Sequence, residues 1–189
     1  MKILLASNSP RRKELLGGLD IPYEVHVIKG IDESYPKTLP AKDVAEYIAQ
    51  KKASAYTEFV TDDTIVLTAD TVVVVGEEIM GKPHDRNDAY RMLSAISGRT
   101  HQVYTGVCIL SMKGDKHFTV KTDVTFRKLT DEEIFYYIDT YKPMDKAGAY
   151  GIQEWIGYVG VTRLEGSYFN VMGLPVQRIY DELKLAHLL

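Results

Sequence analysis

The pattern of apolar positions is clearest in residues 64–75, T-I-V-L-T-A-D-T-V-V-V-V, a β-branched run that only one charged residue, Asp70, interrupts. A continuous apolar run of this length predicts a strand buried on both faces, at the centre of a sheet. Shorter apolar runs predict further strands at residues 2–6, 23–28, 103–112 and 117–127. The last two of these strands flank K-G-D-K and are expected to form a β-hairpin.

Helical spacing and capping residues predict the helices. Val44, Ala45 and Ile48 fall on one face of a helix over residues 41–56. Capping signals mark the others: Ser9 with Pro10 opens a helix that ends near 17–18, and the capping box of Thr130 with Glu133 opens one that ends near 140. Two more helices are predicted at 85–96 and from about 173–175 onward, with a loop and a strand in the glycine-rich segment 147–166.

This mixture of strands and helices predicts an α/β or mixed α+β protein, in which helices flank a mixed β-sheet. No repeat or flexible linker divides the 189 residues. We therefore expect one continuous domain, 1–189, in two lobes around a cleft.

Composition and charge narrow the function classes. A net charge of −3 gives no global basic field, which argues against nucleic-acid binding. The single Cys108 lies in an apolar run and predicts a buried, inert thiol. No apolar run has the length of a signal peptide or a membrane span, so we expect a cytoplasmic protein without a membrane partner.

Asp70 is the strongest candidate for chemistry, because a carboxylate inside an apolar strand is costly to bury unless it is paired or binds metal. A metal ligand or a general base is therefore favoured over a structural aspartate. Aspartyl-phosphate phosphatases offer a rival interpretation, but their motif has two aspartates one residue apart, and Thr68 stands where the first would be.

A second candidate follows the first predicted strand. In A-S-N-S-P-R-R-K-E-L-L, Ser7 and Ser9 form a small-residue loop before a helix that opens with Arg11 and Arg12. Free backbone N–H groups and arginines at a helix N-terminus suit a phosphate. Solvent-exposed charges with a serine cap explain the same stretch, so both interpretations stay open at this point.

Four further residues carry weak signals when each is taken alone. Glu33 lies in an irregular loop, and Lys52 continues the apolar face of the helix over residues 41–56. Lys82 stands between glycine and proline, and Gln153 follows a glycine-rich stretch. Apart from the Gln153 amide, these residues together with Asp70, Arg11 and Arg12 form a set of two carboxylates for a metal and four cations for phosphates.

These residues fall in ordered motifs that run nearly from end to end. Besides the first stretch, the motifs are D-E-S-Y-P, Lys52-Ala53, T-A-D-T-V-V, G-K-P, S-G-R-T-H-Q-V-Y-T-G-V, D-K-A-G-A-Y-G-I-Q-E and G-S-Y-F-N-V-M-G-L-P. The chain resembles the Maf family of nucleoside triphosphate pyrophosphatases. The resemblance implies an elongated fold shared with inosine triphosphate pyrophosphatases, a deep cleft, a divalent cation (Mg²⁺ or Mn²⁺) and a possible homodimer.

The resemblance also assigns roles. It implies hydrolysis of dTTP and UTP, and of some modified pyrimidine nucleotides, to the monophosphate and pyrophosphate as a house-cleaning activity. Asp70 and Glu33 would hold the metal, with Asp70 also the base, and substrate would contact Ser7, Arg11, Arg12, Lys52 and Lys82. Base preference would depend on Arg11, Thr71 and Gln153. The alternative is a nucleotide-binding regulator of cell division that needs no turnover.

Overall fold

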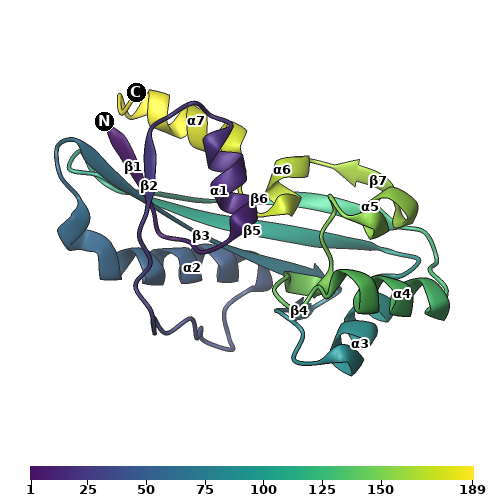
Figure 1. Cartoon of the computed structure of the whole chain (residues 1–189). Coiled ribbons are helices and arrows are strands. Elements are labelled where there is room, and N and C mark those ends of the chain that lie inside the picture. The colour runs from purple at the N-terminus through teal and green to yellow at the C-terminus, as the bar shows by residue number, and fades with distance from the viewer. The chain divides into compact units, whose positions relative to one another are not determined.

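The computed structural model describes all 189 residues and contains one mixed, seven-stranded sheet in the order β2-β1-β3-β5-β6-β7, with β4 paired to β3 (Figure 1). β1 is parallel to β2 and β3, whereas the pairs β3–β4 and β6–β7 are antiparallel. The strands are β1 (Lys2–Leu5), β2 (Tyr23–Val25), β3 (Thr64–Val75), β4 (Glu78–Met80), β5 (Thr100–Leu110), β6 (Lys116–Phe126) and β7 (Val161–Glu165). The predicted mixed α/β class is confirmed.

Seven α-helices and two 3-10 helices accompany the sheet. They are α1 (Pro10–Gly17), α2 (Ala41–Ala53), η1 (Ser54–Phe59), α3 (Arg86–Ile96), α4 (Asp131–Tyr141), η2 (Ala147–Ala149), α5 (Trp155–Gly160), α6 (Tyr168–Met172) and α7 (Val176–Leu185). None of these helices combines the length and the apolar character that crossing a membrane requires.

The main difference from the sequence prediction is α5, which lies where only a loop and a strand were expected. The sequence W-I-G-Y-V-G has two glycines and two β-branched residues, so its intrinsic helix propensity is low and its pattern covers fewer than two turns. Tertiary packing stabilises it instead, because Ile156 and Gly160 are buried and Gly160 packs against the Phe126 ring. The short helix α6 was likewise not predicted.

The predicted strand over residues 23–28 is shorter than expected. Three residues of β2 pair with β1, from Tyr23 opposite Ile3 to Val25 opposite Leu5. Ile28 then donates its backbone N–H to the Tyr56 hydroxyl at 2.7 Å rather than to a strand. The chain therefore leaves the sheet before the long irregular segment that carries Glu33.

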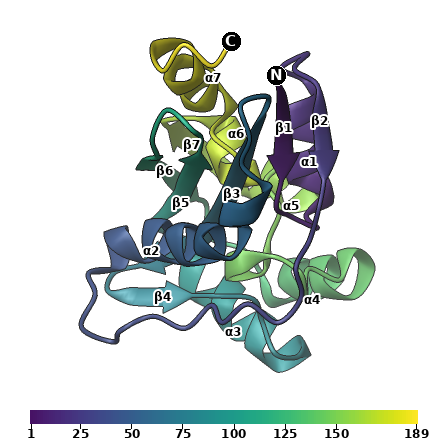
Figure 2. The same cartoon turned by 90° about the vertical axis from the view of Figure 1, so that its left-hand side faces the viewer.

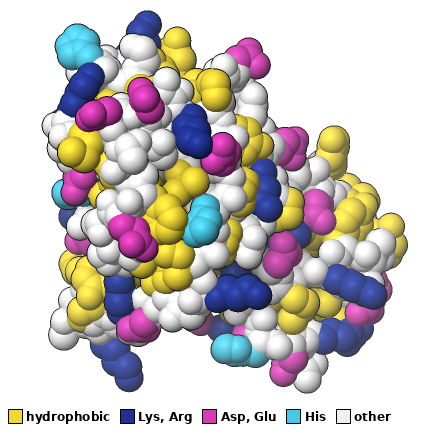
Figure 3. Space-filling model, turned by 60° about the vertical axis from the view of Figure 1, so that its left-hand side comes forward, with side chains coloured by type: hydrophobic (Ala, Val, Ile, Leu, Met, Phe, Trp, Pro, Cys, Tyr) yellow, Lys and Arg dark blue, Asp and Glu magenta, His cyan; other side chains and the backbone are white.

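The chain forms two compact units. Unit 1 comprises Met1–Asp70, Thr105–Val120 and Gly173–Leu189; unit 2 comprises Thr71–Tyr104 and Lys121–Met172. Both chain ends belong to unit 1, where Figure 2 shows β1 and β2 side by side next to α1. Charged side chains of both signs are interspersed on the face shown in Figure 3, as the small net charge predicts.

In unit 1, α2 packs on the sheet through its apolar face. Its buried residues are Val44, Ala45, Ile48, Ala49 and Ala53. Ala49 and Ala53 belong to a core cluster with Leu4, Tyr56, Val66, Cys108 and Leu110. Cys108 is buried, as predicted, and burial raises the pKa of its thiol to about 12, which disfavours the reactive thiolate.

Candidate active site

The loop between β1 and α1 has the geometry that its sequence predicts. Ser9 caps α1 by accepting a hydrogen bond from the Arg12 N–H at 3.4 Å, and Pro10 occupies the first turn. The buried Ser7 hydroxyl accepts the Ser9 N–H at 3.2 Å. Arg11 and Arg12 are both half-buried, so they are not fully solvated surface charges.

Arg12 links this helix to two other parts of unit 1. Its Nε donates to the Gly173 carbonyl at 2.8 Å, and its Nη1 donates to the Ala69 carbonyl at 2.9 Å. Burial lowers the pKa of Arg12; Asp70 opposes this shift, Arg11 adds to it and Glu33 opposes it. Arg12 therefore fixes the backbone next to Asp70 and lies within electrostatic range of both predicted carboxylates.

Lys52, Asp70 and Glu33 form a cluster in direct contact. The Lys52 ammonium lies 2.7 Å from Asp70 Oδ1 and 3.2 Å from Glu33 Oε1. The Lys52 and Asp70 side chains are 13% and 15% exposed, whereas Glu33 is 57% exposed. Lys52 thus contacts one residue 18 positions later in the sequence, Asp70, and one 19 positions earlier, Glu33.

A buried hydrogen bond explains why Lys52 reaches Asp70. Thr68 and Asp70 are two residues apart on β3, so their side chains point to the same face of the strand. The fully buried Thr68 hydroxyl donates to the Ala49 carbonyl at 2.7 Å, which ties α2 to that face. Lys52, one turn after Ala49, then lies over Asp70. Thr68 has a structural role here, which agrees with rejecting the aspartyl-phosphate motif.

Gly106 has a structural role that its sequence motif alone does not reveal. It lies on β5 under α2, and a Cβ atom there would come 2.1 Å from the Glu46 nitrogen and 2.3 Å from the Ala45 carbonyl carbon. Only glycine permits this approach of strand and helix backbones. The signal was present in the motif Q-V-Y-T-G-V, since a glycine inside a strand often marks a close backbone contact.

Asp70 and Glu33 are the candidate ligands for a divalent cation at this site. No group of three or more His, Cys, Asp or Glu side chains forms a metal site in this structure. Mg²⁺ is commonly held by one or two carboxylates together with substrate phosphates and water. Asp70 and Glu33, which share one lysine, fit that mode of binding.

Lys82 lies in unit 2, together with Thr71 and Gln153, and its side chain is exposed after β4. The loop that carries it is hydrogen-bonded to the glycine-rich loop of the Gln153 motif, because Gly148 N–H donates to the Gly81 carbonyl at 3.0 Å. A Cβ atom on Gly148 would meet Val73 at 2.9 Å, and the φ angle of Gly148 is +69°. Unit 2 therefore holds the G-K-P and A-G-A-Y-G-I-Q motifs together.

Gln153 has an unusual environment. Its amide Oε1 is buried and has no hydrogen-bond partner, a state that is uncommon for a buried polar atom. Neighbouring groups are well anchored: the buried Tyr137 hydroxyl accepts the Gly151 N–H at 3.0 Å and lies 3.1 Å from Glu154 Oε1. The segment around Gln153 is therefore fixed while its amide oxygen still lacks a donor.

His101 anchors the same segment from β5. Its Nε2 lies 2.7 Å from the Tyr150 hydroxyl, and the imidazole is fully buried. Burial lowers the pKa of His101 to about 4, although Asp123 acts in the opposite direction. His101 is thus neutral in the folded protein at neutral pH.

A pH dependence of stability follows from His101. Between pH 6.5 and 4 the unfolded chain binds a proton that the folded chain excludes, so stability is lost as the pH falls through this window. We expect a loss of about 3 kcal/mol from this group by pH 4. His101→Gln, whose side-chain amide can replace the imidazole as the hydrogen-bond partner of Tyr150, should flatten the pH dependence of urea unfolding. Parallel profiles for the two proteins would contradict this assignment.

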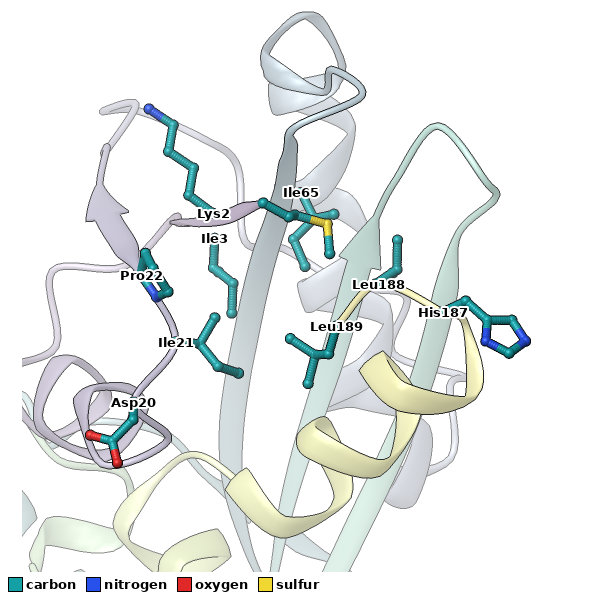
Figure 4. Close-up of a pocket in the computed structure, with 10 residues that line it drawn as sticks. Lys2, Ile3, Asp20, Ile21, Pro22, Ile65, His187, Leu188 and Leu189 are labelled. Carbon is teal, nitrogen blue, oxygen red and sulfur yellow. The ribbon is translucent and has the colours of Figure 1, made fainter.

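A separate cavity in unit 1 contains none of the predicted site residues. Its volume is about 360 Å³, and it is lined by both chain ends together with β1 and the segment after α1. Figure 4 shows Ile3, Ile21 and Leu189 converging, while the charged end of Lys2 and the His187 ring point away. The cavity lining is therefore mainly apolar.

The fold and the site define a mixed α/β protein with a lysine between two carboxylates, beside an arginine-bearing helix N-terminus. The sequence model described as Maf-like protein matches residues 2–186. The chain belongs to the Maf family.

Close relatives share almost the whole chain. A protein of Phocaeicola vulgatus named dTTP/UTP pyrophosphatase is 59% identical over 183 residues, which are 97% of this chain and 95% of the relative. Proteins with the same name from Parabacteroides distasonis and Porphyromonas gingivalis are 57% and 55% identical, with 97% of this chain and 95% and 93% of the relatives covered.

More distant solved structures include a HAM1 protein of Coxiella burnetii, with a TM-score of 0.49 and 12% identity over 98% of this chain and 99% of that one. A nucleoside-triphosphatase / dITP/XTP pyrophosphatase of Mycobacterium abscessus has a TM-score of 0.44 and 15% identity over 100% and 99%.

Proposed function

We propose that this protein is a nucleoside triphosphate pyrophosphatase that hydrolyses dTTP and UTP to the monophosphate and pyrophosphate. The observation that carries the proposal is the Lys52–Asp70–Glu33 cluster, in a chain whose close relatives bear the name dTTP/UTP pyrophosphatase. A triphosphate carries nearly four negative charges, so binding and cleavage depend on cations that neutralise and position it.

The four cationic residues are assigned different roles in binding the triphosphate. Arg11, at the start of α1, and Lys82 are assigned to the phosphates, with Ser7 and the N–H groups of its loop as further donors. Arg12 donates hydrogen bonds to the Ala69 and Gly173 carbonyls, so we assign it to positioning Asp70. By its place in the motif we also assign Arg12 to the phosphates. Lys52 contacts both carboxylates, and we assign it to a phosphate group of the substrate.

Asp70 is assigned as the base for the attacking water. Lys52 contacts Asp70 Oδ1, and we assign the proton from water to Oδ2. Asp70 and Glu33 would hold a divalent cation, Mg²⁺ or Mn²⁺, which when bound supplies positive charge to the phosphate oxygens. Both carboxylates contact the same Lys52 ammonium, at 2.7 Å and 3.2 Å.

The nucleotide panel is the direct test of this function. Purified protein is incubated with dTTP, UTP, CTP, ATP and GTP in Mg²⁺ or Mn²⁺, and pyrophosphate and orthophosphate are assayed separately. We expect pyrophosphate, with the highest kcat/KM for dTTP and UTP. Orthophosphate alone would indicate a phosphatase, and neither product would favour a nucleotide-binding regulator of cell division.

Gln153 is assigned to the base of the nucleotide. Uracil and thymine present an N3–H donor flanked by carbonyl acceptors, and a glutamine amide offers one acceptor and one donor. The fixed position of the segment supports this role, because Gly151, two residues before Gln153, donates its N–H to the buried Tyr137 hydroxyl at 3.0 Å.

We expect Gln153→Leu to lower kcat/KM for UTP by about 10- to 100-fold, which corresponds to the loss of one or two hydrogen bonds to a buried group. The preference for UTP over CTP should narrow, since leucine offers hydrogen bonds to neither base. The measurement is steady-state kinetics with both nucleotides, and the exposed Gln50→Leu on α2 serves as control. An unchanged kcat/KM for UTP would remove Gln153 from the site.

A further inference from the structure

The turn that carries Glu33 is attached to α2 through Lys51. The Lys51 ammonium lies 2.5 Å from Asp32 Oδ2, 2.9 Å from the Ser34 carbonyl oxygen and 3.2 Å from the Ser34 hydroxyl. Asp32 also accepts the Ser34 N–H at 2.9 Å and the Ser34 hydroxyl at 2.7 Å. We call these contacts the Lys51 bridge. They involve the residues on both sides of Glu33.

Two consecutive lysines thus contact two consecutive carboxylates. Neighbouring residues of a helix point about 100° apart, so Lys51 and Lys52 leave α2 in different directions. Lys52 is 13% exposed and reaches Asp70 on β3, whereas Lys51 is 30% exposed and reaches the exposed Asp32. The Lys51 bridge holds Asp32 and Ser34, and Glu33 between them meets Lys52.

Glu33 has little else to define its position. The segment between β2 and α2 contains no helix or strand, and Gly30 has a positive φ of 79°. Glu33 itself is 57% exposed, with the 3.2 Å contact to Lys52 as its ion pair. A long irregular segment of this kind samples many conformations unless it is tied down, and ordering it costs conformational entropy.

We propose that Lys51 is a positioning residue, which acts through Asp32 and Ser34 to hold the Glu33 carboxylate beside Lys52 and Asp70. This inference rests on the role proposed for Glu33 in the pyrophosphatase reaction. Lys51 does not contact the reacting atoms. Its effect on turnover passes through the turn, in the way that groups behind a metal ligand orient it.

The two ends of the Lys51 bridge permit a discriminating experiment. Lys51→Met removes a positive charge and Asp32→Asn removes a negative one, so an effect of net charge on the anionic substrate has opposite signs in the two variants. Positioning predicts the same sign. We expect each variant to lower kcat for dTTP by about tenfold and to raise the Mg²⁺ concentration for half-maximal activity, with a smaller change in KM.

Three further variants complete the experiment. Lys51→Arg should restore kcat to within about threefold of wild type, because a guanidinium can bind the Asp32 carboxylate with two hydrogen bonds. Lys42→Met, an exposed lysine of the same helix, should leave kcat and the melting temperature unchanged. The double variant Lys51→Met/Asp32→Asn should be no worse than either single variant, since both break one set of contacts.

The outcomes separate the inference from the proposed function. Opposite effects of Lys51→Met and Asp32→Asn, additive effects in the double variant, or wild-type kinetics of Lys51→Met overturn the positioning role. Glu33→Gln is measured in parallel. If it is impaired while Lys51→Met is not, the inference fails and the role of Glu33 stands; if Glu33→Gln is fully active, the proposed role of Glu33 fails, and the inference fails with it.

Discussion

Asp70→Asn is expected to lower kcat for dTTP by at least about a thousandfold, because it removes the group assigned both to the attacking water and to the cation. Asparagine has nearly the same volume and cannot accept a proton at neutral pH. Arg12 still holds the Ala69 carbonyl and Thr68 still holds α2, so the backbone around position 70 keeps its contacts. We expect the melting temperature to stay within about 5 °C of wild type.

Steady-state kinetics and circular dichroism check this expectation on the same samples. Asp62→Asn, at an exposed carboxylate in the turn before β3, is the matched control and should be fully active. A titration with Mg²⁺ then separates the two assigned roles. Partial recovery at high Mg²⁺ indicates that Asp70 acts chiefly as a ligand, and no recovery indicates the base. A variant with normal kcat would exclude Asp70 from the mechanism.

Gly106→Ala is expected to have the largest effect on stability. The added methyl group would overlap the backbone of Ala45 and Glu46 at 2.1–2.3 Å, and a helix backbone cannot rotate away as a side chain can. We expect the free energy of unfolding to fall by about 3 kcal/mol or more, and the melting temperature by about 10 °C. Because α2 carries Lys51 and Lys52, displacement of the helix should also lower kcat.

Thermal unfolding followed by circular dichroism measures the loss of stability. Gly17→Ala provides the control in the same unit, because a Cβ atom there meets only the Tyr23 side chain at 3.7 Å. Alanine also has the higher helix propensity, so this control should be neutral or slightly stabilising. A Gly106→Ala protein as stable as wild type would show that α2 does not depend on this approach.

The strongest local signals predicted their elements well. The strand over residues 64–75 is confirmed at both ends, as is the capping box of Thr130 and Glu133. These elements depend on chemistry within a few residues: β-branched side chains in one case, and reciprocal side-chain hydrogen bonds in the other. The helices α5 and α6 could not be predicted in this way, because they are too short to show a period and are held by distant packing.

Some residues of the candidate site could likewise be predicted from the sequence, and others could not. Asp70 could be found from the sequence because a carboxylate in an apolar strand is unusual by itself. The family motifs then assigned Glu33 and Lys52 to the same site. In the structure Lys52 contacts both carboxylates, which the sequence did not predict. Lys51 carried no such signal, since a lysine near the end of a helix is an ordinary residue until its neighbours are known. The glycine at position 106 indicated a close backbone contact, but the sequence did not tell which element approaches it.

The amino-acid sequence by itself determined the fold class, the central strand, the family and the residue types available for chemistry, because all of these depend on local pattern or on motifs. Only the tertiary structure decided which groups meet. Thr68 joins α2 to β3, Gly106 lets the helix approach the sheet, and Lys52 comes to lie between Asp70 and Glu33. Such contacts join residues far apart in the chain, and their distances are set by packing that no local pattern records.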